Sequence, residues 1–208
     1  MPSSLTRIFL AGSAFWIALS SSLRFSMPAL AMDSACQAAL AAQVDLKNKP
    51  FHVYMTSENK YASANFSKAA ASIGLTGVKK SEEISTGKDV YVLNNGKWID
   101  MHMSFAEMSK SNQDDPDIKK AREKAREADQ CKTLPDEAAF GQAATVYQTH
   151  NPETGDTKIW VSKSSRLPIK AETTNKVGPM TKFVSTRYDY GNVQAPANAI
   201  SMSDMMKK

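Results

Sequence analysis

The chain has 208 residues, with 26 Lys or Arg against 21 Asp or Glu, so its formal net charge is +5 at pH 7. Basic and acidic residues are mixed along the chain and not gathered in one block, which argues against a nucleic-acid-binding protein. The sequence contains no H-E-x-x-H, G-x-S-x-G or glycine-rich phosphate loop, so common motifs of metalloproteases, serine hydrolases and nucleotide-binding enzymes are absent. We therefore expect a protein that is not an enzyme and that has no cofactor.

The first 31 residues have the pattern of a secretory signal peptide. Arg7 precedes an apolar run over residues 8–19, and Ala29-Leu30-Ala31 fits a cleavage site. The run is shorter than the roughly 20 residues that a membrane span needs. An uncleaved membrane anchor is the alternative, but no longer apolar run follows. We expect a periplasmic protein with one domain over residues 32–199 and a flexible tail over residues 200–208.

Two cysteines, Cys36 and Cys131, lie in the exported part of the chain. An even number of cysteines in an oxidising compartment predicts a disulfide between them. Closing a loop of about 95 residues would stabilise the fold by about 4–5 kcal/mol on the chain-entropy model. A lipid-modified Cys36 is disfavoured because Asp33 stands where a leucine is usual. A redox pair is disfavoured because the two cysteines lack C-x-x-C spacing.

The first half of the exported chain begins with helix signals and continues with strand signals. Asp33 or Ser34 can cap an Ala-rich helix over residues 33–49, which Pro50 ends. The next expected elements are a strand over residues 51–56, a mixed segment over 57–77 that ends in a short helical turn, and an outer strand over 78–85.

Residues 90–103 form the clearest predicted hairpin. Asn95-Gly96 is a preferred pair for a tight turn, because both central residues need a positive φ. Past the turn, Ile99, Met101 and Met103 are predicted to share one face of the second strand. The other face then carries Trp98, Asp100 and His102.

Two helices are expected after this hairpin. Ser104 followed by Glu107 forms a capping box for a short helix over residues 104–110. A charged helix is expected over residues 116–130, with Pro116 near its first turn. Its apolar stripe consists of one isoleucine and three alanines, so we expect it to lie over the surface of the domain.

From residue 139 onward the sequence predicts strands only. The expected strands cover residues 143–150, 157–163, 168–173 and 181–190, with turns at 151–156, 164–168 and Gly178-Pro179. Loops this short between consecutive strands require antiparallel pairing. The whole chain therefore predicts an α+β domain with six to eight strands and two or three helices.

The strand region around Trp160 resembles the outer-membrane lipoprotein carrier (LolA-like) superfamily. The matching positions are Trp160, the Leu167-Pro168 turn and Lys170, with Arg166 where glycine is common. The hairpin with Gly96-Lys97-Trp98 is similar to uncharacterised periplasmic branches of the same superfamily. The resemblance implies a strongly curved antiparallel sheet, or half-barrel, whose concave side is covered by two or three helices and holds acyl chains. The family's sheet arginine that is coupled to lid opening has no matching position here.

The predicted function is the binding of a lipid or acylated protein in an apolar cavity, for transport or sensing. The expected ligand is a lipid or acylated lipoprotein, an inner- or outer-membrane protein is an expected partner, and the protein is expected to be a monomer. A cell-envelope interaction module whose cavity is filled by its own side chains is the alternative. The expected cavity lining consists of Val53, Met55, Val92, Ile99, Met101, Met103, Val146, Ile159 and Val161.

A copper site is a weaker alternative, suggested by Met101-His102-Met103 and the methionines nearby and in the tail. Thioether and imidazole groups suit Cu(I). In a strand, however, the two methionines point together and His102 points away. The remaining histidines, His52 and His150, lie on separate predicted elements, so we expect no metal site.

Overall fold

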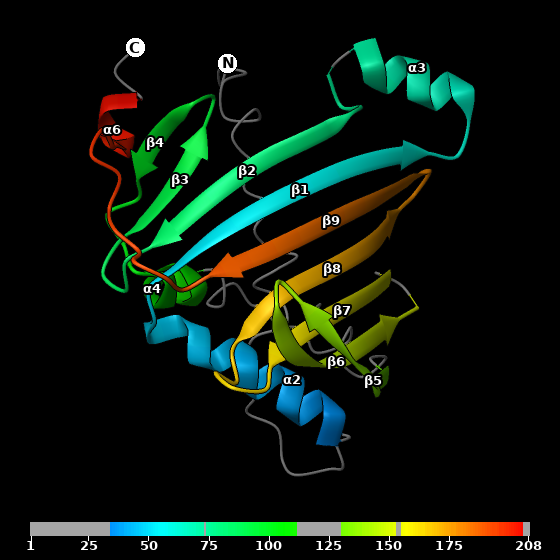
Figure 1. Cartoon of the computed structure of the whole chain (residues 1–208). Helices are drawn as coiled ribbons and strands as arrows, with labels where there is room; N and C mark the ends of the chain where they lie inside the picture. Colours follow the sequence, from blue (N-terminus) through cyan, green and yellow to red (C-terminus); the bar gives the residue numbers. More distant parts are fainter. Residues whose placement is uncertain (1–33, 73, 112–129, 153–154, 206–208) are drawn as a thin grey trace.

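The computed structural model describes residues 34–72, 74–111, 130–152 and 155–205. These residues form a single open, curled sheet of ten strands in the order β10-β4-β3-β2-β1-β9-β8-β7-β6-β5, with a few short helices (Figure 1). The predicted α+β class with a curved, largely antiparallel sheet is confirmed in this outline.

The strands account for most of the described chain. They are β1 (Phe51–Tyr61), β2 (Val78–Ser85), β3 (Val90–Asn94), β4 (Lys97–Asp100), β5 (Gln130–Ala139), β6 (Gln142–Asn151), β7 (Gly155–Ser162), β8 (Pro168–Val177), β9 (Met180–Asp189) and β10 (Ile200–Ser201). The helices are α2 (Ser34–Val44), the 3-10 turn η1 (Asp45–Asn48), α3 (Ala64–Ser72), α4 (Phe105–Ser111) and α6 (Met202–Met205).

Long hairpins build the sheet, and β1 joins its two halves by pairing with β2 on one side and with β9 on the other. The tight turn between β3 and β4 is confirmed, because Asn95 has a φ of 50° and Gly96 a φ of 76°. One pairing differs from the antiparallel expectation. Ile200 and Ser201 run parallel to β4, so the expected flexible tail begins with a paired strand.

The helices lie at different parts of the sheet. Ala42 of α2 packs on Ile159, Val161 and Ala171, whereas Leu46 of η1 packs on Phe51 and its neighbours in β1. We call the sheet face that these contacts cover the helix-side face and the other the opposite face. Helix α3 lies at the far end of β1 from α2 (Figure 1).

The capping box predicted for the short helix is present at the start of α4. The backbone N–H of Ser104 donates to Glu107 Oε2 at 2.8 Å, and the backbone N–H of Glu107 donates to Ser104 Oγ at 3.2 Å. The helix is held against the sheet by an edge-to-face contact between Phe105 and Phe51, with ring centroids 5.3 Å apart.

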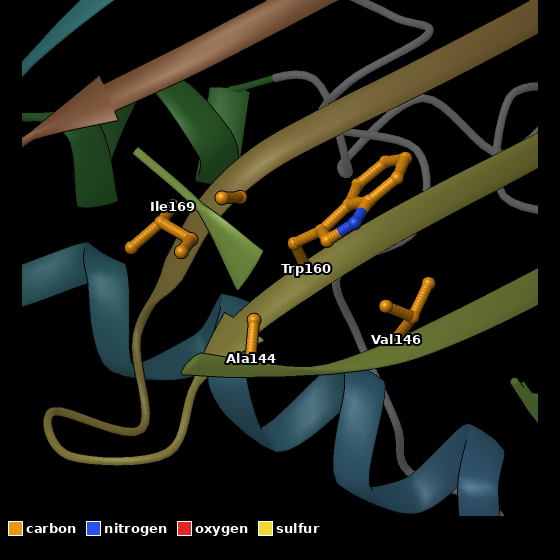
Figure 2. Close-up of a cluster of buried hydrophobic side chains, with 5 residues drawn as sticks. Ala144, Val146, Trp160 and Ile169 are labelled. Carbon is orange, nitrogen blue, oxygen red and sulfur yellow. The ribbon is translucent and has the colours of Figure 1, made fainter. Parts of the chain in front are cut away.

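A second core cluster lies on the opposite face. Ala144, Val146, Trp160 and Ile169 are buried together with Ala139, on the side of the strands away from α2 (Figure 2). The Trp160 indole N–H donates to Glu137 Oε2 at 2.8 Å. The sheet therefore buries apolar side chains on both faces where β5 to β8 meet.

Several expectations about strands were wrong. The described residues form ten strands and not the six to eight that were predicted. Residues 78–85 form β2 as predicted, but β2 is an inner strand between β1 and β3 and not an outer one. β4 ends at Asp100, because His102 has a φ of 49° that breaks the extended chain, so the predicted facing of Met101 and Met103 does not apply. The sequence reading also missed β5. Pro135 and a register shift between Leu134 and Glu137 interrupt the alternation of buried and exposed residues in β5. Both irregularities are tolerated because β5 is an edge strand.

Two predicted segments fall outside the described residues. They are the signal peptide over residues 1–31 and the charged helix over residues 116–130, apart from Gln130, which begins β5. Among the residues that the structure does describe, no helix has the length and hydropathy needed to cross a membrane.

Candidate ligand-binding face

The helix-side face carries apolar side chains in rows that cross the sheet. Residues that pair directly across strands share a face. One such row runs from Ile99 in β4 through Val92 and Glu83 to Val53 in β1 and Tyr188 in β9. These residues belong to strands that are far apart in the sequence, and the sheet brings them into one line.

A second row lies beside the first and extends to the other half of the sheet. It runs from Met55 in β1 through Thr186 and Ala171 to Ile159 in β7 and Tyr147 in β6. Met55 is 6% exposed and Ile159 is 5% exposed, so this part of the face is shielded from water.

Six of the nine predicted lining residues lie on this face. They are Val53, Met55, Val92, Ile99, Ile159 and Val161. Val146 does not join them, because it pairs with Trp160 and belongs to the cluster on the opposite face. Met101 and Met103 follow the end of β4, where their backbones bond to Val90, and both side chains are half-buried.

The least expected residue on this face is Glu83. Its side chain is 2% exposed, and its Oε1 atom has no hydrogen-bond partner among the described residues. Burial raises the pKa of the Glu83 carboxyl well above its usual value. An acidic group in this position is costly, because an unsatisfied buried acceptor destabilises by about 1–3 kcal/mol.

Tyrosine hydroxyls lie on the same side of the sheet as this acid. Burial, and then the negative charge of Glu83, raise the pKa of Tyr188. Burial also raises the pKa of Tyr190, whose hydroxyl donates to the carbonyl oxygen of Pro168 at 2.5 Å. The first row therefore holds two polar groups, Glu83 and Tyr188, within an otherwise apolar setting.

The helix-side face becomes basic toward the α3 end. Lys79 in β2 pairs with Ser57, and Lys182 in β9 pairs with Asn59, so both lysines flank β1 on this face. Partial burial, and then repulsion from Lys79, lower the pKa of Lys182. The face thus grades from apolar near α2 and η1 to polar and basic near α3.

The opposite face carries a strip of aromatic and cationic side chains. His52 stacks on Tyr54 with ring centroids 4.1 Å apart and contacts Trp98 edge-on at 6.1 Å. The Arg187 guanidinium lies 5.5 Å from the Tyr54 ring and 5.0 Å from the Phe140 ring. Phe140 is 53% exposed, so this aromatic–cationic strip is open to solvent at one end.

The histidines do not form a metal centre in the described parts of the chain. His52 lies 3.0 Å from Glu82, His102 lies 3.4 Å from Asp100, and His150 lies 2.6 Å from Asp156. Each histidine has its own carboxylate, and no group of three or more His, Cys, Asp or Glu suited to a metal occurs among the described residues.

The predicted disulfide remains a prediction, because the side chain of Cys36 is outside those described. The backbone arrangement is compatible with it, since α2 carries Cys36 and contacts β5, which carries Cys131. Cys131 Sγ lies 3.8 Å from Thr149 Oγ1 on the neighbouring strand.

Glu83 was missed in the sequence because nothing in its neighbourhood marks it. It lies in the run Ser81-Glu82-Glu83. Strand alternation places Glu82 and Glu83 on opposite faces of the sheet, but it does not show which of the two faces is buried. Only the pairing of β2 with β1 and β3 places Glu83 beside Val53 and Val92.

Solved structures of other proteins resemble this chain only with low TM-scores and low sequence identity. No protein-family model matches the sequence, and no curated protein matches it. LppX, a lipoprotein of Mycobacterium tuberculosis, has a TM-score of 0.38 at 9% identity, over 78% of this chain and 97% of that one. The MucA/MucB complex of Pseudomonas aeruginosa gives 0.40 at 12% identity, over 78% of this chain and 59% of that one.

A third solved structure is similar to a comparable degree. A putative outer-membrane lipoprotein-sorting protein domain from Vibrio parahaemolyticus gives a TM-score of 0.28 at 11% identity, over 78% of this chain and 95% of that one. These identities and scores assign no ligand, activity or family to the chain. The following proposals therefore rest on its own residues.

Proposed function

We propose that this chain is an exported, non-catalytic, LolA-like protein of the periplasm that binds an acyl chain, of a lipid or an acylated protein, on its helix-side face. The observation that carries the proposal is the pair of adjacent rows of largely apolar side chains, which crosses the sheet from β4 to β6. The apolar members of these rows include Ile99, Val53, Met55 and Ile159.

The cover over this face supports the proposal. Among the α2 residues whose side chains are described, the buried ones are the alanines Ala35, Ala39 and Ala42, so the helix approaches the sheet closely at these positions. The contact that these three alanines make is by methyl groups, each of which buries little apolar area. An acyl chain that replaced these contacts would gain about 0.8 kcal/mol for each buried CH₂ group.

The aromatic–cationic strip on the opposite face supports a second candidate function, a protein-interaction module. Tyr, Trp and Arg are the residue types that contribute most to protein interfaces. Tyr54, Trp98 and Arg187 lie together there, with Tyr54 37% exposed. On this alternative, the helix-side face is a filled core.

Native mass spectrometry of the protein purified from its own cell envelope, under non-reducing conditions, tests the first proposal. We expect a mass excess that disappears in organic solvent and matches a phospholipid, a fatty acid or an acylated peptide. An apo mass, together with no uptake of a fluorescent fatty acid by the purified protein, would overturn acyl binding and favour the interaction module.

A matched pair of variants in β3 locates the binding face. Val92 and Leu93 are adjacent and both half-buried, but Val92 is on the helix-side face and Leu93 is on the other. We expect Val92→Asp to reduce bound lipid at least tenfold and Leu93→Asp to leave it unchanged, with both variants folded by circular dichroism. Equal loss in both variants would remove the assignment to this face.

A further inference from the structure

Glu83 and Tyr188 are placed symmetrically about one residue of β1. Val53 pairs with Glu83 of β2 on one side and with Tyr188 of β9 on the other. Neighbouring strands lie about 4.8 Å apart, so the two Cα atoms are separated by roughly 10 Å. Both side chains rise from the helix-side face, one on each side of Val53.

One oxygen of the carboxyl group at this position lacks a donor among the described residues. Glu83 Oε1 is buried and has no hydrogen-bond partner in the described part of the chain. The paired residues around it, Val53 and Val92, offer no donor from their side chains. The neighbouring polar residues on the face, Ser81 and Ser85, lie one pleat away along β2.

We propose that Glu83 and Tyr188 form the headgroup site of the acyl-binding face and select amphiphiles whose head is a neutral hydroxyl. The ligand hydroxyl donates to Glu83 Oε1, and the Tyr188 hydroxyl donates to the ligand oxygen. The acyl chain then lies along the second row, toward Met55 and Ile159. This inference rests on the proposed acyl binding.

The surrounding charges favour a neutral head over an ionic one. Burial raises the pKa of both Glu83 and Tyr188, which favours the uncharged form of each group. Among the described residues, the other ionisable groups on this face include Tyr190 beside Tyr188, Tyr147 in the second row, Lys97 near Ile99, and Lys79 and Lys182 toward the α3 end. Glu83 and Lys79 are four residues apart in β2, about 13 Å along an extended strand, too far for direct contact.

The test compares three ligands of equal chain length by calorimetry on the delipidated full-length mature protein: 1-dodecanol, its methyl ether and dodecanoic acid. The methyl ether keeps the acceptor oxygen but cannot donate. We expect the wild-type protein to bind dodecanol about tenfold more tightly than the ether, as one buried hydrogen bond predicts. The preference over dodecanoate should rise with pH as the fatty acid ionises.

Variants separate the roles of the two residues: Glu83 sets the preference, and Tyr188 contributes to the affinity for both ligands. Glu83→Leu should bind the alcohol and the ether equally, with ether affinity unchanged, whereas Glu83→Gln keeps an acceptor and should retain most of the preference. Tyr188→Phe should weaken the alcohol and the ether alike, severalfold, because the Tyr188 hydroxyl donates to an oxygen that both ligands carry, and it should leave the preference unchanged. Glu82→Leu is the control, because Glu82 is the next residue of β2 but lies on the opposite face.

The outcomes separate the two proposals. If no acyl ligand binds the wild-type protein, acyl binding itself fails and the headgroup site fails with it. If all three ligands bind equally, acyl binding stands and the headgroup site is wrong. A full preference in Glu83→Leu would also overturn the headgroup site. Should Glu83→Leu not fold, wild-type affinity of Tyr188→Phe for both the alcohol and the ether would overturn it.

Discussion

Acidic side chains on the two faces of the sheet differ in burial and in hydrogen-bonding partners. On the opposite face, Glu82 lies 3.0 Å from His52 and Glu172 lies 2.7 Å from Lys170, and each pair is partly exposed. On the helix-side face, Glu83 is buried and its Oε1 has no partner among the described residues. One step along β2 therefore separates a solvated, paired acid from a buried, unpaired one.

The same contrast holds for the aromatic residues. Trp160 on the opposite face is buried, and its indole N–H donates a hydrogen bond to Glu137, so the polar atom of this aromatic side chain has a partner. Tyr188 on the helix-side face is partly buried beside an unsatisfied acid. Complete polar pairing is what a purely structural core requires. The helix-side face departs from that rule at Glu83, which is why we propose the headgroup site there.

The largest expected effect on stability concerns the predicted disulfide between Cys36 of α2 and Cys131 of β5. Replacing both Cys36 and Cys131 by serine should lower the free energy of unfolding by about 4–5 kcal/mol, because the unfolded chain regains the entropy of a loop of about 95 residues. Urea unfolding of the oxidised wild-type protein and of the double variant measures this difference. Reaction of two free thiols per oxidised wild-type chain would disprove the link.

Removal of Trp160 tests whether the opposite-face cluster is structural. Trp160→Ala deletes a side chain that is 3% exposed and should cost about 3–5 kcal/mol of unfolding free energy. Trp98→Ala is the control, since Trp98 is half-buried on the same face and should cost less. If the two variants lose the same stability, the cluster around Trp160 is not the core that its burial indicates.

Local signals in the sequence were sufficient for most of the fold. Asn95-Gly96 fixed the hairpin between β3 and β4, and Ser104 with Glu107 fixed the start of α4, because turn and cap chemistry act within a few residues. The β6 to β9 strands followed from their β-branched and aromatic content. In β5, Pro135 and the bulge removed the alternation on which such a prediction depends.

Pairing between distant strands decided what local signals could not. Val146 was placed with Val161 in the predicted lining, yet alternation from Tyr147 puts it beside Trp160 on the other face. Glu83 gained its importance only through its neighbours Val53 and Val92, which are about 30 and 9 residues away in the sequence. The face that a strand buries is a property of the whole sheet, so the candidate site was predicted only in part.

The pH dependence of stability tests the state of Glu83. Burial raises its pKa in the folded protein above the unfolded value near 4.5, so between the two values the folded state holds the extra proton. Its contribution is therefore fully present below the unfolded pKa and is lost as pH rises through the folded pKa, with a slope of up to about 1.4 kcal/mol per pH unit. Glu83→Gln should lack this slope.

Urea unfolding of the wild-type protein and Glu83→Gln at several values from pH 4 to pH 8 measures this effect. The difference between the two proteins cancels titrations that they share. A difference that stays constant over the range would mean that Glu83 has the same pKa in both states. The contrast between Glu83 and its paired neighbour Glu82 would then have no energetic basis.

The smallest expected effect concerns the cover of the helix-side face. Ser104→Ala removes the acceptor for the Glu107 N–H and should lower the unfolding free energy by about 1 kcal/mol, whereas Ser104→Asp keeps an acceptor and should stay close to the wild-type value. Helix α4 contacts the sheet through Phe105 and Phe51, so weakening its first turn should let α4 unfold locally while the sheet stays folded. Hydrogen exchange should therefore quicken in α4 of Ser104→Ala and remain slow in β6 and β7. Equal quickening in all three elements would show that cover and sheet unfold together, and that the helix-side face cannot open independently of the cluster around Trp160.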